Sequence, residues 1–162
     1  MVKKIIFPLL VLMLSGCAAM NASGPLFEKH FFVPEGKALV YLMKPDSVSK
    51  DGVTTCLTLA LGDTEYGCVR GEGYIVAEVD AGKYQAALVN KAGFGYKLLK
   101  FDLEVRSREA VYLEYAFGRG LTGESLDTRF ANIGLIISGN HVVAKIQEEE
   151  ALQKLSTLKL SI

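Results

Sequence analysis

The chain has 162 residues, 50% of them hydrophobic, and its 18 basic and 18 acidic residues give a formal net charge of zero. A chain of this length can bury one hydrophobic core and fits a single domain. Because Lys and Arg are not in excess, the composition excludes a strongly basic surface for nucleic acid.

The first sixteen residues have the layout of a signal peptide. Lys3 and Lys4 give a positive start, and an apolar run follows over Ile5–Leu14. A transmembrane helix needs about 20 apolar residues, and here Ser15 and Gly16 end the run well short of that. We therefore expect residues 1–16 to be removed rather than to span a membrane.

The stretch Leu14-Ser15-Gly16-Cys17 resembles the lipobox of bacterial lipoproteins, in which the cysteine thiol receives diacylglycerol before cleavage. The resemblance implies that Cys17 begins the mature chain and carries acyl groups such as palmitate. The alternative is an ordinary secretory signal that contains Cys17 by chance. Two or three acyl chains, at about 0.8 kcal/mol per buried methylene, anchor a protein stably, whereas one does not. The expected partner is a membrane, reached through this anchor.

The residue after the cysteine carries a prediction about location. Some bacterial envelopes retain lipoproteins at the inner membrane when aspartate follows the cysteine, and here the residue is Ala18. This predicts the outer membrane, facing the periplasm, or the cell membrane if the host has only one. Loss of residues 1–16 leaves 16 basic and 18 acidic residues, a net charge of −2.

Residues 17–34 read as the lipidated N-terminus and a linker, because small and polar residues run from Ala18 to Pro25. About 16 flexible residues would reach roughly 20 Å, which would hold the domain clear of the headgroups. An apolar cluster inside this segment has two interpretations, packing on its own domain or contact with the bilayer; its members are Leu26, Phe27, Phe31 and Phe32.

Residues 35–162 predict a mostly β domain. Short runs rich in Val, Leu, Ile and Tyr alternate with Gly, Asp and Lys turns, as in a sandwich or barrel. Alternation is clearest over Leu99–Val105, where every second residue is apolar. The expected strands cover residues 38–43, 54–61, 64–69, 74–79, 84–89, 98–105 and 111–117. We favour an antiparallel β-sandwich of the immunoglobulin or transthyretin kind.

Turn residues predict how the strands connect. Gly62-Asp63 and Ala81-Gly82 are expected to close hairpins, and residues 106–109 to join the next pair. Gly139-Asn140 predicts a two-residue turn between strands at 131–138 and 142–146. Glu148–Leu158 begins with glutamates and has apolar residues at helical spacing, which predicts a short terminal helix.

Cys56 and Cys68 lie at mirror positions about Gly62. A three-residue hairpin loop centred there would place them opposite each other, at a separation that a disulfide can bridge. An oxidising compartment favours the bond. The alternative is two buried thiols, since a shift of one residue in register separates them. No histidine stands at a metal-ligand spacing from this pair, so we expect no metal site.

Residues 118–123 match the spacing GxGxxG and include Arg119. A phosphate loop requires Lys and then Ser or Thr after the last glycine, whereas Glu124 and Ser125 follow here. A dinucleotide site requires a helix at this point, and Asp127-Thr128-Arg129 interrupts any early apolar face. We therefore expect a loop between strands and no nucleotide cofactor, with Arg119 as a candidate binding residue.

No catalytic set emerges from the remaining residues. There is no GxSxG motif, and a Ser-His-Asp set would depend on His141, beside a predicted turn. We expect no enzyme, no catalytic residue and no cofactor.

The loop Lys91–Lys97 places Phe94 and Tyr96 among glycines. Exposed aromatic residues are enriched at binding hot spots, so these two are candidate binding residues for an envelope protein. The alternative is that the loop folds back over the edge of the sandwich.

The order of turns and strands also resembles a known family. The segments Gly36–Tyr41, Leu59–Gly67 and Gly73–Tyr84 are similar to bacterial lipoproteins grouped as domain of unknown function 2846. The likeness covers about residues 35 to 117 and more loosely 148 to 160, and Ala81-Gly82-Lys83 replaces the family's Pro-Gly-Lys type of turn. It implies an extracytoplasmic β-sandwich and supplies no catalytic residues. The predicted function is a non-catalytic envelope interaction or structural module, with a periplasmic carrier of a small ligand as the alternative.

Overall fold

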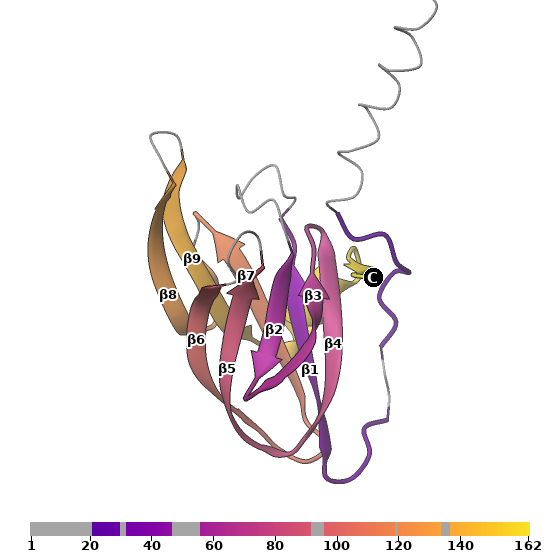
Figure 1. Ribbon diagram of the computed structural model, residues 1–162. Helices are drawn as coiled ribbons and strands as arrows, with labels where there is room; N and C mark the ends of the chain where they lie inside the picture. The colour runs from indigo at the N-terminus through magenta and orange to yellow at the C-terminus, as the bar shows by residue number, and fades with distance from the viewer. Residues whose placement is uncertain (1–20, 30–31, 47–55, 92–95, 119, 134–136) are drawn as a thin grey trace, which may run out of the picture.

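Two β-sheets pack face to face, and one short helix covers the outer face of the larger sheet (Figure 1). The computed structural model describes residues 21–29, 32–46, 56–91, 96–118, 120–133 and 137–162. The larger sheet has the strand order β10-β4-β1-β7-β9-β8, and the smaller has the order β3-β2-β5-β6. The predicted β-sandwich with a short C-terminal helix is confirmed.

The elements have the following bounds: β1 Lys37–Lys44, β2 Leu57–Leu61, β3 Thr64–Val69, β4 Gly73–Asp80, β5 Gly82–Asn90, β6 Tyr96–Val105, β7 Ala110–Phe117, β8 Glu124–Ile133, β9 Ile137–Ile146, α3 Glu148–Leu155 and β10 Lys159–Leu160. Each of the strands predicted between residues 38 and 117 corresponds to one of β1 to β7. Residues 54 and 55 of the predicted second strand lie outside the described residues.

The main core lies between the sheets and follows the two-residue period of the strands. In β1, Val40 and Leu42 point into this core, while Tyr41 and Met43 point to the opposite face of the larger sheet. All four are at most 2% exposed, because both faces of the larger sheet are covered. This explains why β1 is apolar throughout rather than alternating.

Helix α3 and the segment before β1 cover the outer face of the larger sheet. Ala151 and Leu155 of the helix are fully buried there. Glu148 begins the helix and Lys154 lies in its last turn, which places both charges favourably in the field of the helix dipole. Helix α3 ends at Leu155, three residues before the predicted end at Leu158.

Some turns carry the chain from one sheet to the other, whereas others join neighbouring strands of one sheet. Gly62-Asp63 closes the hairpin of β2 and β3, as predicted. The turn at Ala81 was expected to close a second hairpin, and that is wrong, because β4 pairs with β1 while β5 pairs with β2 and β6. Strands β1 and β7 pair in parallel. This pairing joins segments far apart in sequence, and local turn signals do not reveal it.

The predicted turn at Gly139-Asn140 is also wrong. Both residues lie inside β9, where they pair with Ala131 and Phe130 of β8. Strand β8 begins at Glu124 and so includes Asp127, whose carboxylate accepts a hydrogen bond from the backbone N–H of Lys100 on β6, at 2.8 Å. The side chain of Asp127 therefore covers part of β6, which is an edge strand of the smaller sheet. This polar contact explains why the sequence of β8 does not read as apolar.

Candidate functional site

The N-terminal segment from Asn21 to Phe27 is docked on the sandwich and on residues near the end of the sequence. The backbone N–H of Ala22 donates to Gly71 at 2.9 Å, and that of Gly24 donates to Leu160 at 3.0 Å. The N–H of Leu160 donates in return to Pro25 at 2.8 Å. Much of the segment predicted as a linker therefore belongs to the folded domain.

Phe27 holds the last part of this segment in place. Its ring packs edge-on against Tyr41 and Tyr74, with centroids 5.8 and 5.6 Å apart. Leu26 and Phe32 are 57% and 81% exposed. Of the predicted apolar cluster, Phe27 packs on its own domain, and Phe31 lies outside the described residues.

One end of the sandwich gathers the start of this segment and several strand ends. Asn21 pairs with Gly71 in the connection between β3 and β4. Lys44 at the end of β1 pairs with Gly73, and Asn90 at the end of β5 pairs with Leu57. We call this the Asn21 end, and it lies at the top of Figure 1.

The Asn21 end has a polar surface hollow. It has a volume of about 370 Å³ and is lined by Asn21, Ala22, Ser23, Glu72, Thr157 and Lys159. The amide of Asn21 donates to the carboxylate of Glu72 at 3.1 Å, and Lys159 is exposed. Sequence reasoning missed this site because its residues come from three separate segments, and no local motif marks any of them.

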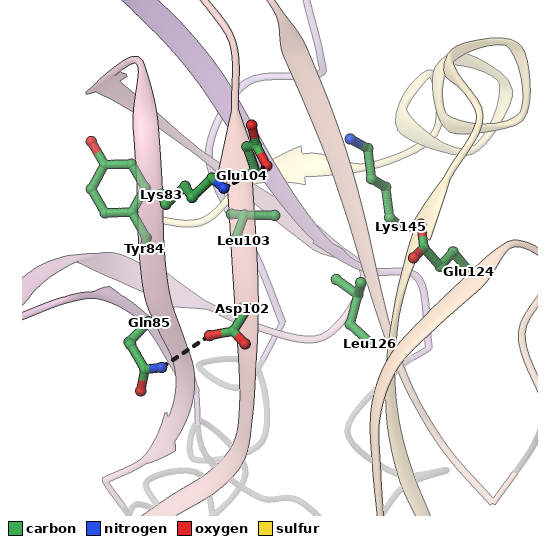
Figure 2. A pocket seen from close by; sticks show the side chains of 9 residues that line it. All are labelled: Lys83, Tyr84, Gln85, Asp102, Leu103, Glu104, Glu124, Leu126 and Lys145. Atoms are coloured by element: carbon green, nitrogen blue, oxygen red, sulfur yellow. Dashed lines mark hydrogen bonds and ion pairs between the residues drawn. The ribbon is translucent and has the colours of Figure 1, made fainter.

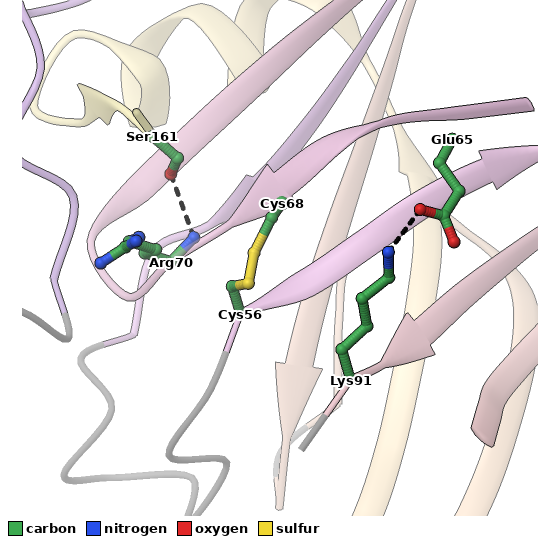
Figure 3. The surroundings of a disulfide bond; sticks show 6 residues. All are labelled: Cys56, Glu65, Cys68, Arg70, Lys91 and Ser161. Carbon is green, nitrogen blue, oxygen red and sulfur yellow. Dashed lines mark hydrogen bonds and ion pairs between the residues drawn. A yellow bond between two sulfur atoms is a disulfide. The ribbon is translucent and has the colours of Figure 1, made fainter. Parts of the chain in front are cut away.

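A disulfide joins Cys56 and Cys68 close to the same end (Figure 3), as predicted, with their Cα atoms 5.3 Å apart. The route differs from the expected three-residue loop. The turn has two residues, since Leu61 pairs with Thr64, and a register shift follows between Thr58 and Ala60. Beyond this shift Cys68 pairs with Thr58, so Cys56 and Cys68 are close across the two strands but not directly opposite each other as expected. Nearby, the hydroxyl of Ser161 accepts a hydrogen bond from the backbone N–H of Arg70 at 3.0 Å.

The remaining predicted site residues fall largely outside the described part of the chain. This applies to Cys17, Phe94 and Arg119. Tyr96 is the first residue of β6 and pairs with Asn90, so its backbone lies at the Asn21 end. After the glycine-rich stretch at 118–123 the chain enters strand β8, not a helix, which removes the structural context of a dinucleotide site.

His141 is buried between the sheets. It is 2% exposed, its Nδ1 lies 2.7 Å from the hydroxyl of Tyr115, and the ring of Phe117 lies 4.8 Å from its own. Lys44 is also buried, one residue beyond Met43, which pairs with Glu114 on β7. These polar side chains are part of the interior of the domain.

A second depression, of about 580 Å³, runs between β5 and β6 on one side and β8 and β9 on the other (Figure 2). The side chain of Gln85 donates to Asp102 at 2.9 Å, and Lys83 pairs with Glu104 at 3.6 Å. Lys145, at its rim, pairs with Glu109 at 3.2 Å. The charges along this groove largely satisfy one another, so it has no strong preference for one sign of ligand charge.

At Glu109, hydrogen bonds offset the effect of burial on the pKa of the carboxylate. Burial opposes the charge on this carboxylate, but hydrogen bonds from the backbone of Arg106 and from Lys145 outweigh it and lower its pKa. The group therefore remains a stable anion that fixes the turn between β6 and β7.

Among the described residues, no helix has the length and apolar character needed to cross a membrane. Within the same part of the chain, no three His, Cys, Asp or Glu side chains gather as metal ligands would. Comparison of the sequence and structure with family models, curated proteins and solved structures found no match. The resemblance to domain of unknown function 2846 therefore stays a prediction.

Proposed function

We propose that this protein is a lipid-anchored module of a bacterial envelope that acts by binding or by structural support, without catalysis. Cys17 carries the acyl groups, and Ala18 directs the protein to the outer membrane with the domain facing the periplasm. The observation that carries the proposal is the lipobox-like stretch ending at Cys17, four residues before the docked segment begins at Asn21.

The disulfide supports the extracytoplasmic part of the proposal. Structural disulfides form and persist in oxidising compartments and are rare in the cytosol. The bond between Cys56 and Cys68 lies at the same end of the domain as Asn21. The likeness to domain of unknown function 2846 also favours an extracytoplasmic β-sandwich.

The environment of His141 supports a role without catalysis. A general base must reach the proton that it abstracts in a bound substrate. His141 is buried beside Tyr115 and Phe117, so the histidine on which an enzymatic interpretation depends is not presented to a substrate. A hydrogen-bonded core histidine accounts for the geometry.

Metabolic labelling with palmitate and intact-mass measurement test the anchor. We expect labelled protein in the outer-membrane fraction and no label in a Cys17→Ser variant. An unlabelled wild-type protein would refute lipidation, and label confined to the inner membrane would refute the proposed location.

Affinity capture after cross-linking in cells tests the interaction role. We expect a stoichiometric envelope partner that is lost in a Phe94→Ala, Tyr96→Ala variant. Phe32→Ala is the matched control, because Phe32 is an exposed aromatic residue in another part of the chain. No partner in any variant, together with a small molecule retained in native mass spectrometry, would favour the alternative of a ligand carrier.

A further inference from the structure

The length of chain between the predicted anchor and the docked segment limits how far the domain can stand from a membrane. Three residues, Ala18 to Met20, lie between Cys17 and Asn21, so four residue steps join their Cα atoms. A fully extended chain spans at most about 3.6 Å per residue, so Asn21 can be no more than about 14 Å from the Cα of Cys17. The polar headgroup layer of one leaflet is itself roughly 6 Å thick.

Asn21 is also fixed to the domain and is not the start of a longer flexible linker. Its amide bonds to Glu72, and the next residue bonds to Gly71 through its backbone. Pairing with Leu160 and the packing of Phe27 hold the residues that follow. The short span of chain therefore limits the position of the whole domain and not only that of its N-terminal residues.

The surface around Asn21 has the chemistry of a headgroup contact. The hollow at this end exposes the ammonium of Lys159 and the carboxylate of Glu72. These two groups can pair with the phosphate and the ammonium of a zwitterionic phospholipid. A charge-balanced polar surface favours contact with headgroups over insertion into hydrocarbon.

We infer that the Asn21 end is the membrane-facing surface of this protein and that it lies on the phospholipid headgroups, with the opposite end directed into the periplasm. This inference rests on the proposed lipidation of Cys17. It replaces the expectation of a domain held about 20 Å from the bilayer by a flexible linker. It also places the paired strand ends Asn90 and Tyr96 at the end nearest the membrane.

The test uses the lipidated full-length protein in vesicles of phosphatidylethanolamine and phosphatidylglycerol that contain a lipid with a nitroxide on its headgroup. A small fluorophore is attached to one introduced cysteine, either Thr157→Cys at the hollow or Ala81→Cys beyond the far end of β4. Both positions are exposed. Strand β4 has eight residues, so the two labels differ in height by about 25 Å.

We expect several-fold stronger quenching at Thr157→Cys than at Ala81→Cys. Equal quenching at the two positions, in protein whose intact mass includes the acyl groups, would overturn the inference and leave the proposed anchor standing. If the intact mass lacks acyl groups, the proposed function and the inference fall together.

Two further variants separate the short tether from other causes of proximity. A Gly-Ser spacer of about 16 residues between Met20 and Asn21 would add roughly 20 Å of reach, and it leaves the domain unchanged. We expect this spacer to remove most of the quenching at Thr157→Cys.

Gly24→Ala changes the docking itself, because a Cβ at Gly24 would collide with the carbonyl oxygen of Leu160. We expect it to reduce quenching at Thr157→Cys. Gly82→Ala is the control, since a Cβ there would meet no atom within 4 Å.

Undiminished quenching in the variant with the Gly-Ser spacer would show that the tether does not set the position of the domain and would overturn this argument.

Discussion

The pairing of helix α3 with the larger sheet gives a prediction about stability. Glu114 on β7 is completely buried, and the ammonium of Lys154 on α3 lies 2.5 Å from its carboxylate. Lys154 also pairs with Glu150 one helical turn earlier, at 2.6 Å. The substitution Lys154→Met keeps most of the length of the side chain and removes its charge.

The two pairs contribute unequally. Removing one partner of a buried ion pair costs about 3–5 kcal/mol, because the other charge stays in the interior. Exposed pairs at this helical spacing contribute about 0.3–0.5 kcal/mol. The side chain of Glu150 is 31% exposed, whereas that of Glu114 is 0% exposed. We expect Lys154→Met to lower the free energy of unfolding by about 3 kcal/mol, and Glu150→Gln by about 0.5 kcal/mol.

The contribution of these pairs to the free energy of unfolding depends on pH, and it falls at both alkaline and acidic pH. Burial opposes the charge of Lys154, but the carboxylates of Glu114 and Glu150 outweigh it and raise its pKa above 10.5. Its contribution is complete below that pH and is lost as the pH rises through the raised folded-state pKa. Hydrogen bonds from Lys154 and Thr122 lower the pKa of Glu150 below 4.5. That contribution is present above pH 4.5 and is lost as the pH falls through the lowered value.

Urea unfolding at neutral pH measures these effects, followed by far-UV circular dichroism. A double-mutant cycle with Glu114→Gln isolates the buried pair, and we expect the double variant to recover part of the loss from Lys154→Met. If Lys154→Met costs no more than Glu150→Gln, the buried pair does not hold α3 to the sheet, and the reasoning fails.

The other predictions concern the docked segment, the disulfide and a crowded glycine. Gly24→Ala should lower the free energy of unfolding by about 2 kcal/mol through lost backbone hydrogen bonds, while Gly82→Ala should change it little in the same urea titration. Reduction of Cys56–Cys68, which closes a sequence separation of 12, should cost about 3 kcal/mol on the chain-entropy estimate; a urea midpoint unchanged by reductant would contradict this. Gly123→Ala should destabilise more than Gly82→Ala in thermal unfolding, because Gly123 has a φ of 103° and a Cβ there would lie 2.5 Å from the carbonyl oxygen of Lys145.

The sequence predicts the strands of this fold better than their partners. Leu99–Val105 alternates because one face of β6 is buried and the other exposed, and this pattern is local. The pairing of β1 with β7 depends on residues about 70 positions apart, such as Leu39 and Ala110. The chain itself gives no periodic signal for such a contact.

Errors in the C-terminal third have a physical cause. Gly139-Asn140 has the composition of a hairpin turn, but pairing with β8 keeps both residues inside β9. Tertiary pairing thus overrides a turn preference. The candidate site shows the same limit. Spacing predicted the bond between Cys56 and Cys68 but not the register of β2 and β3 that brings them together. Lys159 reaches the hollow through its pairing with Gly73.

The docking of the N-terminal segment on the last residues of the chain also links folding to position. Residues Gly24–Phe27 find their hydrogen-bonding partners at Leu158 and Leu160, so the segment cannot close until α3 and β10 are in place. In a chain still unfolded at its C-terminal end, a longer undocked segment would join the proposed anchor at Cys17 to the sandwich. Under the proposed lipidation of Cys17, completion of the fold would shorten this segment and bring the domain to the membrane surface.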